Sequence, residues 1–223
     1  MAIIATSDAT SKLEAIETGS HIATCVQMIH IGTVSDEFEG KPVKGNKVRI
    51  TFELPGLMVK FKEDEPEQPR FISKEFTLSL GSKASLRKFL DTWRGKPFTE
   101  DEARAFDITK LLGVSCMLSI GSKTSAKGQA YNTIDSALAL PKGIPAPEQI
   151  TPTIEVNYDN ISETWKHVPK YLREKMELTP EFINSGFQFP AEENEVSNDP
   201  IEETEETKED PTNAGLKKKP LPF

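Results

Sequence analysis

Apolar and polar residues alternate with a period of two in five separate segments of the chain. The segments cover residues 21–31, 47–54, 74–80, 114–120 and 130–138. The alternation is clearest in the second segment, whose apolar set is Val48, Ile50, Phe52 and Leu54. Such a pattern is typical of β-strands that bury one face and expose the other. The sequence therefore predicts a mainly β protein with five strands.

Between the third and fourth segments the apolar period becomes helical. Residues 83–93 place one apolar face on a predicted helix, and Gly95 follows as a stop signal. Thr99 with Glu102 three residues later has the form of a capping box, which predicts a second short helix. The order is thus three strands, a helical insertion and two strands.

This order is that of the OB-fold, a five-stranded Greek-key barrel with a helix between strands 3 and 4. A five-stranded sandwich that does not close is the main alternative. The barrel is favoured because the helix falls where it would plug one end of the barrel.

The chain divides into four parts. We predict an N-terminal extension over residues 1–18 and the OB-fold domain over 19–145. Residues 146–190, a Pro-rich strap with a short helix at 167–177, are expected to pack on the barrel because they are too few for a separate core. Residues 191–223 are acidic and poor in large apolar side chains, which predicts a disordered tail.

The net charge of −8 is unevenly distributed. Residues 191–210 hold ten acidic residues and one lysine, whereas residues 70–130 hold eleven Lys or Arg against six Asp or Glu. A basic middle with an acidic appendage is compatible with a polyanionic partner, unlike a uniformly acidic protein.

Catalytic chemistry has no support in the sequence. None of His21, His30 and His167 has a Cys, Asp or His neighbour at metal-ligand spacing. Cys25 and Cys116 both lie in apolar runs, which predicts reduced, buried thiols. We therefore expect no enzyme activity, no metal and no cofactor. No apolar run approaches the ~20 residues that cross a membrane, so a cytoplasmic protein without a membrane partner is expected.

The predicted hairpin loop between the last two strands is the best ligand candidate. Lys123 and Lys127 can reach phosphates, and the ring of Tyr131, in the outward phase, can stack on a base. Lys47 and Arg49 lie in the outward phase of the second strand, on the usual binding face of an OB-fold. We predict one groove lined by these five residues and extended by Lys74. The alternative is a set of ordinary solvated surface charges.

The chain resembles phage-encoded single-stranded-DNA-binding proteins with an OB-fold. The resemblance is carried by LRKFL at 86–90, WRGKPF at 93–98, residues 106–113, residues 127–134 and LPKG at 140–143. It implies a protein that coats single-stranded DNA without strong sequence preference during replication or recombination, in the host cytoplasm. A non-catalytic protein-interaction adaptor on the same barrel is the alternative.

The C-terminal tip is similar to that of bacterial single-stranded-DNA-binding proteins, which end in an acidic stretch and an apolar-Pro-Phe tip. The tip residues here are Leu221, Pro222 and Phe223. The similarity implies that the tail recruits replication or recombination proteins. The negative charge of the tail separately predicts competition with DNA for the groove. Unlike those tails, this one carries three lysines at 217–219, separated from the tip by Pro220. The alternatives are that this basic end binds DNA, folds over the acidic run or suits a different partner. The sequence does not specify an oligomeric state.

Overall fold

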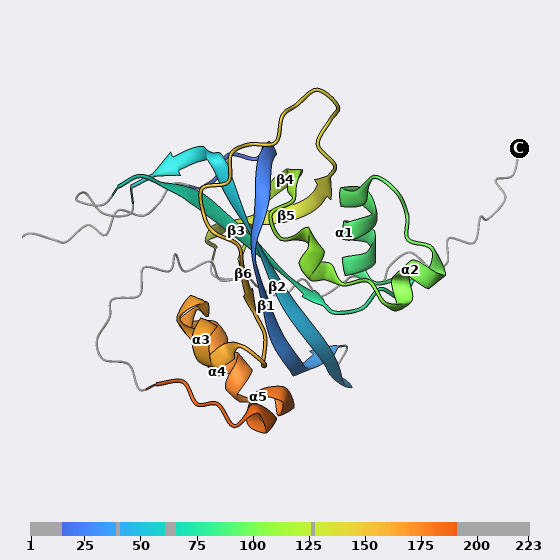
Figure 1. Cartoon of the computed structure of the whole chain (residues 1–223), viewed down its shortest axis with the longest axis vertical. Coiled ribbons are helices and arrows are strands. Elements are labelled where there is room, and N and C mark those ends of the chain that lie inside the picture. Colours follow the sequence, from blue (N-terminus) through green and yellow to red (C-terminus); the bar gives the residue numbers. More distant parts are fainter. Residues whose placement is uncertain (1–14, 39–40, 61–65, 126–127, 191–223) are drawn as a thin grey trace, which may run out of the picture.

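The computed structural model describes residues 15–38, 41–60, 66–125 and 128–190, and these form a mainly β structure (Figure 1). Its strands are β1 (Gly19–Phe38), β2 (Lys41–Val59), β3 (Gln68–Thr77), β4 (Ser115–Thr124), β5 (Ala130–Leu138) and β6 (Ile154–Val156). The first five form an antiparallel sheet in the order β3-β2-β1-β4-β5, and β6 adds to β1 in parallel. The predicted fold class is confirmed at this level.

The path of paired strands ends at β3 on one side and β5 on the other. Within the described residues no main-chain pairing joins these two end strands. They nevertheless approach each other, because the Nζ of Lys74 on β3 donates a hydrogen bond to the carbonyl oxygen of Ile134 on β5 at 2.6 Å. Main-chain pairing thus leaves the sheet open, and its closure into an OB barrel stays a prediction.

The helical insertion follows β3. It consists of α1 (Ser85–Arg94), α2 (Glu100–Arg104) and the 3₁₀ turn η1 (Ile108–Leu111). The left-handed Gly95, with φ of 68°, ends α1, and the predicted capping box of Thr99 and Glu102 is present at the start of α2. A glycine suits the first of these positions because it adopts positive φ without steric cost.

The main core lies between α1 and one face of the sheet, which we call the inner face. The alternating set on β2, from Val48 to Leu54, faces this core and is at most 3% exposed. Phe52 packs against Trp93 of α1, with ring centroids 5.3 Å apart. Cys25 and Cys116 are buried here and unbridged, as predicted. Burial raises the pKa of both thiols, that of Cys116 to about 12, so neither is a ready nucleophile.

A second core lies on the opposite, outer face of β1. The C-terminal segment covers it with α3 (Ile161–Thr164), the 3₁₀ turn η2 (Trp165–His167), α4 (Lys170–Glu177) and α5 (Pro180–Ser185). The buried members of this cluster include Ile29 and Ile31 from β1 with Leu172, Met176 and Phe182 from the helices. These elements follow one another along the lower part of the sheet in Figure 1. The predicted domain boundaries stay predictions, and the predicted extension before residue 15 and tail from 191 lie outside the described residues.

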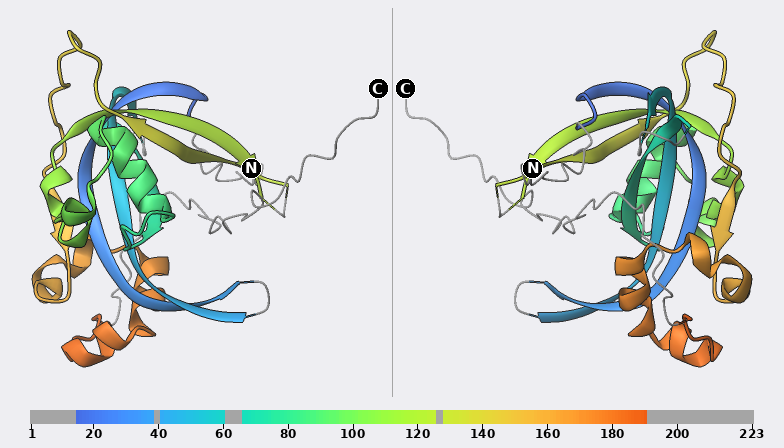
Figure 2. Two further views of the ribbon diagram at one scale, coloured as in Figure 1. Left: turned by 90° about the vertical axis from the view of Figure 1, so that its right-hand side faces the viewer. Right: turned by 90° about the vertical axis from the view of Figure 1, so that its left-hand side faces the viewer.

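Several strand limits differ from the pattern-based ones. β1 and β2 continue beyond the alternating residues into a long hairpin arm, which projects to the same side of the molecule as the β4–β5 hairpin (Figure 2). β3 ends at Thr77, which leaves Leu78 exposed. In β5 a bulge at Asp135 reverses the phase, so Ala137 is buried while Leu138 is 49% exposed.

Candidate nucleic-acid interface

The outer face of β2 and β3 carries a row of polar side chains. Cross-strand pairs on this face join Lys47 to Thr77, Arg49 to Glu75, Thr51 to Ser73 and Glu53 to Phe71. These residues alternate with the buried apolar set on β2, and the pleat therefore turns them away from the main core. Lys47 and Arg49 thus lie two residues apart on one face of one strand.

A groove of about 320 Å³ lies between this outer face and the C-terminal segment. Its lining combines basic, aromatic and hydroxyl-bearing residues with aliphatic and proline side chains, and none of the lining residues is acidic. The residues are Val26, Gln27, Arg49, Thr51, Phe71, Ser73, Thr151, Pro152, Ile154, Lys166, His167, Pro169 and Tyr171. We call this feature the strap groove, because the segment from Thr151 to Tyr171 forms one of its walls.

Arg49 is the central cation of the strap groove. Its guanidinium carbon lies 5.7 Å from the centroid of the Tyr171 ring, a cation–π arrangement that joins β2 to α4. Its Nε is buried and makes no hydrogen bond to any described residue. A buried donor without a partner is uncommon in native proteins. Because this nitrogen is shielded from the surface, a ligand in the groove would meet the rest of the guanidinium.

A chain of hydrogen bonds orders the floor of the strap groove. The Ser73 hydroxyl donates to Thr51 at 3.1 Å, and the Thr51 hydroxyl donates to the side-chain oxygen of Gln27 at 3.2 Å. The amide nitrogen of Gln27 then donates to the carbonyl oxygen of His167 at 3.1 Å. Because this chain runs from β3 through β2 and β1 to η2, it fixes the floor relative to the wall.

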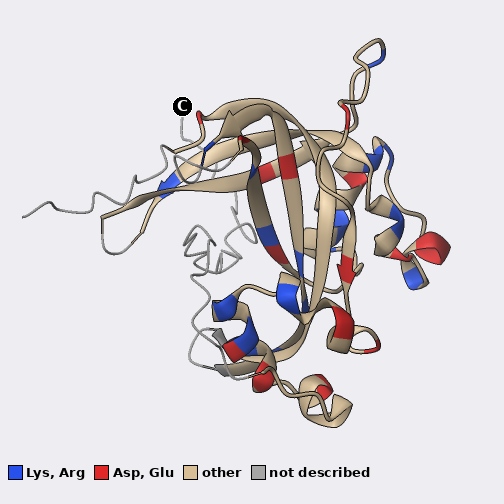
Figure 3. Ribbon diagram, turned by 60° about the vertical axis from the view of Figure 1, so that its left-hand side comes forward, with Lys and Arg blue, Asp and Glu red and all other residues tan. Residues whose placement is uncertain are grey.

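The carboxylates beside the strap groove are already committed to other partners. Both oxygens of Glu53 accept backbone N–H groups, from Ile150 and Thr151, at 2.9 Å each. Glu75 forms an ion pair with Lys175 of α4 at 2.8 Å. In Figure 3, basic positions lie both on the sheet and on the C-terminal helices, close to where the helices meet the sheet. The groove therefore presents cations to a ligand, while the neighbouring anions hold the C-terminal segment in place.

The β4–β5 arm brings two of the predicted residues together. Lys123 and Tyr131 are direct cross-strand partners; Lys123 is exposed and Tyr131 is half-buried. Tyr131 shares its face with Thr133. Lys127 lies outside the described residues, as does the predicted tip of Leu221, Pro222 and Phe223. The pair on this arm and the pair on β2 belong to different hairpins, and their union in a single groove stays a prediction.

Lys74 lies on the inner face rather than with the other groove candidates. Besides its hydrogen bond to β5, its Nζ lies 5.4 Å from the ring centroid of Phe76 and 5.8 Å from that of Phe89, both core residues. The reason is its phase, because Lys74 is two residues from the inward-facing Phe76. Lys74 therefore does not line the groove as expected. Instead, its amine links the two end strands of the sheet, β3 and β5.

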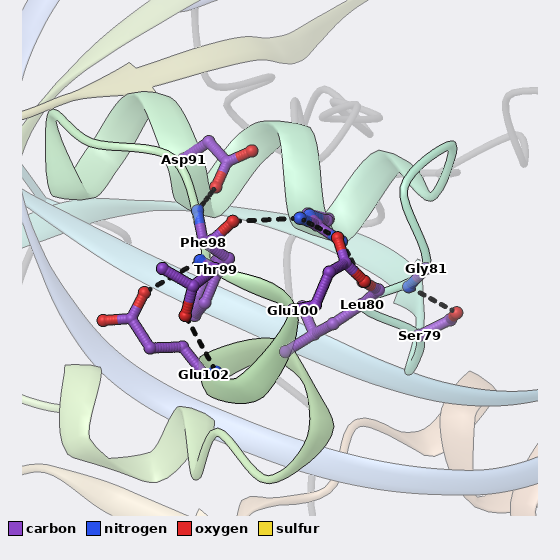
Figure 4. A network of polar contacts seen from close by, with 9 residues as sticks. Ser79, Leu80, Gly81, Asp91, Phe98, Thr99, Glu100 and Glu102 are labelled. Atoms are coloured by element: carbon purple, nitrogen blue, oxygen red, sulfur yellow. Dashed lines mark hydrogen bonds and ion pairs between the residues drawn. The ribbon is translucent and has the colours of Figure 1, made fainter.

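Two arginines of α1 hold the helical insertion together. Figure 4 shows part of its network of polar contacts, around Phe98, Thr99 and Glu100. Arg87 is buried, donates to the carbonyl oxygens of Leu80 and Phe98, and pairs with Glu100 at 2.9 Å. Arg94 pairs with Glu102 at 2.9 Å. Hydrogen bonds from the Thr99 backbone N–H and from Arg94 lower the pKa of Glu102 to about 2. These two arginines are thus structural, and neither belongs to the strap groove.

Comparisons with protein-family models and with curated proteins gave no match. The family resemblance of the sequence therefore stays a prediction. Among the residues with a described placement, no group of three or more His, Cys, Asp or Glu side chains could hold a metal ion. No helix in the described ranges is long and apolar enough to span a membrane.

Proposed function

We propose that this chain binds single-stranded DNA without strong sequence preference, as a non-enzymatic protein of DNA replication or recombination. The observation that carries the proposal is the strap groove, a basic and aromatic surface on the outer face of β2 and β3. Unpaired nucleic acid presents phosphates and exposed base faces together, and this combination of cations and rings suits both.

We propose further that the sheet is a partly open OB barrel. The pairing order supports this, because β1 pairs with both β2 and β4. The two end strands, β3 and β5, are linked by the hydrogen bond from Lys74 of β3 to Ile134 of β5. OB-folds bind oligonucleotides on the face of strands 2 and 3 and with the loops that join strands 1–2 and 4–5. In the proposed barrel the strap groove corresponds to that face. The β1–β2 and β4–β5 hairpin arms, which project to the same side in Figure 2, correspond to the two loops.

In the proposed complex the phosphates contact Lys47, Arg49 and Lys123, and bases stack on the rings of Tyr131 and Tyr171. Base–aromatic stacking contributes about 1–3 kcal/mol per base and tolerates any sequence, because every base has a π-face. Phosphate contacts release counterions, so affinity should fall steeply with salt. Duplex DNA keeps its bases stacked inside and should bind more weakly.

The test is a fluorescence-anisotropy titration of the full chain with labelled (dT)₂₀, the corresponding RNA and duplex DNA, each at two salt concentrations. We expect tightest binding to single-stranded DNA, with a steep loss at the higher salt. Lys47→Ala and Lys123→Ala should each weaken binding, whereas Lys142→Ala, at an exposed lysine that follows β5, serves as the charge-matched control. Absence of binding to single-stranded DNA at low salt would refute the proposal.

For the acidic tail we propose two linked roles, competition with DNA for the groove and recruitment of replication or recombination proteins through Leu221, Pro222 and Phe223. Removal of residues 191–223 should tighten binding to single-stranded DNA at low salt, because ten acidic residues no longer compete with phosphates. An unchanged affinity after truncation would exclude the competition.

A protein-interaction adaptor is the second candidate function. It is favoured by two exposed apolar side chains of the C-terminal segment, Leu178 (83% exposed) and Ile183 (66% exposed). Exposed apolar side chains mark docking sites where they form one patch. Two results together would establish this alternative. The chain would bind no oligonucleotide, and it would bind a partner protein that the double variant Leu178→Ser/Ile183→Ser no longer binds.

A further inference from the structure

The strap groove has the size and chemistry of a site for one nucleotide rather than for a length of strand. Its volume of about 320 Å³ is at the lower end of the range for small-molecule sites, ~300–1,000 Å³. Its lining offers two aromatic rings, those of Phe71 and Tyr171, together with the cations Arg49 and Lys166. A continuous strand, in contrast, needs an open path along the surface.

We propose that the strap groove receives a single unpaired nucleotide, with its base against the ring of Tyr171 and its phosphate at Arg49 and Lys166. The inference rests on the proposed binding of single-stranded DNA, and it assigns the C-terminal segment a direct part in that binding. One base of the bound strand leaves the stack and enters the groove, while the neighbouring nucleotides continue over the outer face towards the β4–β5 arm.

The position of Arg49 supports a site for an anion beside a flat ring. Its guanidinium lies 5.7 Å from the Tyr171 centroid, and its buried Nε has no hydrogen-bond partner among the described residues. Arg49 lines the groove, so the accessible part of its guanidinium can bond to an incoming phosphate while the arginine stays beside the ring on which the base stacks. The nearest carboxylates do not compete for the arginine, since Glu53 is held by two backbone N–H groups and Glu75 by Lys175.

The groove floor supplies polar groups for the edge of a base. The Ser73 hydroxyl donates to Thr51 and keeps its own acceptor capacity, and the Gln27 amide uses one of its two N–H donors on the His167 carbonyl. One donor and one acceptor at the floor can bond to any of the bases. The groove floor therefore accommodates a nucleotide without selecting which base it carries.

The experiment uses the full chain and two probes, thymidine 5′-monophosphate and (dT)₂₀, with an abasic oligonucleotide of equal length as reference. We expect the monophosphate to bind, and Tyr171→Leu to weaken its binding by about fivefold or more, the loss of one stack. Tyr171→Phe, which keeps the ring, should restore it. Lys166→Ala should weaken it too, whereas Lys88→Ala on the exposed side of α1 should not.

With the oligonucleotides, Tyr171→Leu should reduce affinity for (dT)₂₀ while leaving affinity for the abasic strand unchanged. Equal losses on both strands, or no loss on either, would overturn the nucleotide site while leaving general single-strand binding intact. Monophosphate binding in a chain that ignores all oligonucleotides would instead retain the site and refute the proposed function. If Tyr171→Phe binds as weakly as Tyr171→Leu, the ring does not stack on the base and the inference fails.

Discussion

Replacement of Glu53 by glutamine tests whether this buried carboxylate fastens the C-terminal segment to the sheet. Glu53 is 0% exposed, and its two oxygens accept the backbone N–H groups of Ile150 and Thr151 at 2.9 Å each. Glutamine keeps the shape and one acceptor oxygen but presents an NH₂ group to the other N–H. One of the two hydrogen bonds is then lost, and two donors face each other.

The magnitude follows from the lost interaction. A hydrogen bond to a charged group contributes about 1.5–3 kcal/mol, and a buried donor left without a partner costs about 1–3 kcal/mol. We therefore expect Glu53→Gln to lower the free energy of unfolding by about 2–3 kcal/mol. Such a loss is large against a typical total of about 5–15 kcal/mol.

The assay is urea unfolding of the full chain, monitored by tryptophan fluorescence. With a denaturant slope of about 2 kcal/mol per molar urea, the midpoint should fall by about 1–1.5 M. Glu148→Gln, an exposed carboxylate in the same segment, is the matched control and should leave the midpoint unchanged. The reasoning is refuted if the two variants unfold at the same urea concentration. Affinity for (dT)₂₀ should also fall in Glu53→Gln alone, because Thr151 belongs to the groove wall.

Three further predictions concern other parts of the molecule. Lys74→Met keeps the apolar stem but removes the amine between the end strands, so stability should fall by about 1.5 kcal/mol in the same urea assay while (dT)₂₀ affinity stays unchanged. Burial opposes ionisation of Glu181, but hydrogen bonds from the Thr33 hydroxyl and N–H outweigh it and lower its pKa, so the carboxylate stabilises the fold above the ordinary carboxyl pKa. That contribution to stability should disappear as pH falls through the lowered pKa. The urea midpoints of wild type and Glu181→Gln should therefore converge in acid. A difference between the two midpoints that stays constant with pH would contradict the assignment. The two core cysteines should react with a thiol reagent only at the rate of unfolding, and fast labelling of the native chain would contradict their burial.

Local patterns in the sequence were sufficient to predict much of the sheet. The alternation from Val48 to Leu54 identifies the inner face of β2 because burial of one face imposes a period of two. The capping box at Thr99 and the limits of β5 also follow from local chemistry. The bulge at Asp135 was missed because one extra residue reverses the facing without altering composition, and Leu138 is exposed for that reason.

The candidate site was harder to predict because distant parts of the chain form it. The alternation along β2 alone places Lys47 and Arg49 on the outer face of the sheet. Lys74 lies two residues from the inward-facing Phe76, and the same alternation along β3 would have placed it on the inner face. Tyr171 carries only the signal of an amphipathic helix, and nothing local indicates that it meets Arg49. That contact depends on β6 pairing with β1 and on the anchoring of the C-terminal segment by Glu53, both tertiary features.

The most direct test of the central claim is lysine footprinting, in which the full chain is acetylated with and without (dT)₂₀ and each lysine is quantified by mass spectrometry. If the outer face of β2 and β3, the strap groove and the β4–β5 arm hold the strand, DNA should protect Lys47, Lys123 and Lys166. Lys88 on α1 and Lys142 after β5 should be acetylated equally in both samples. Protection centred on Lys88, or uniform over all five lysines, would contradict the account.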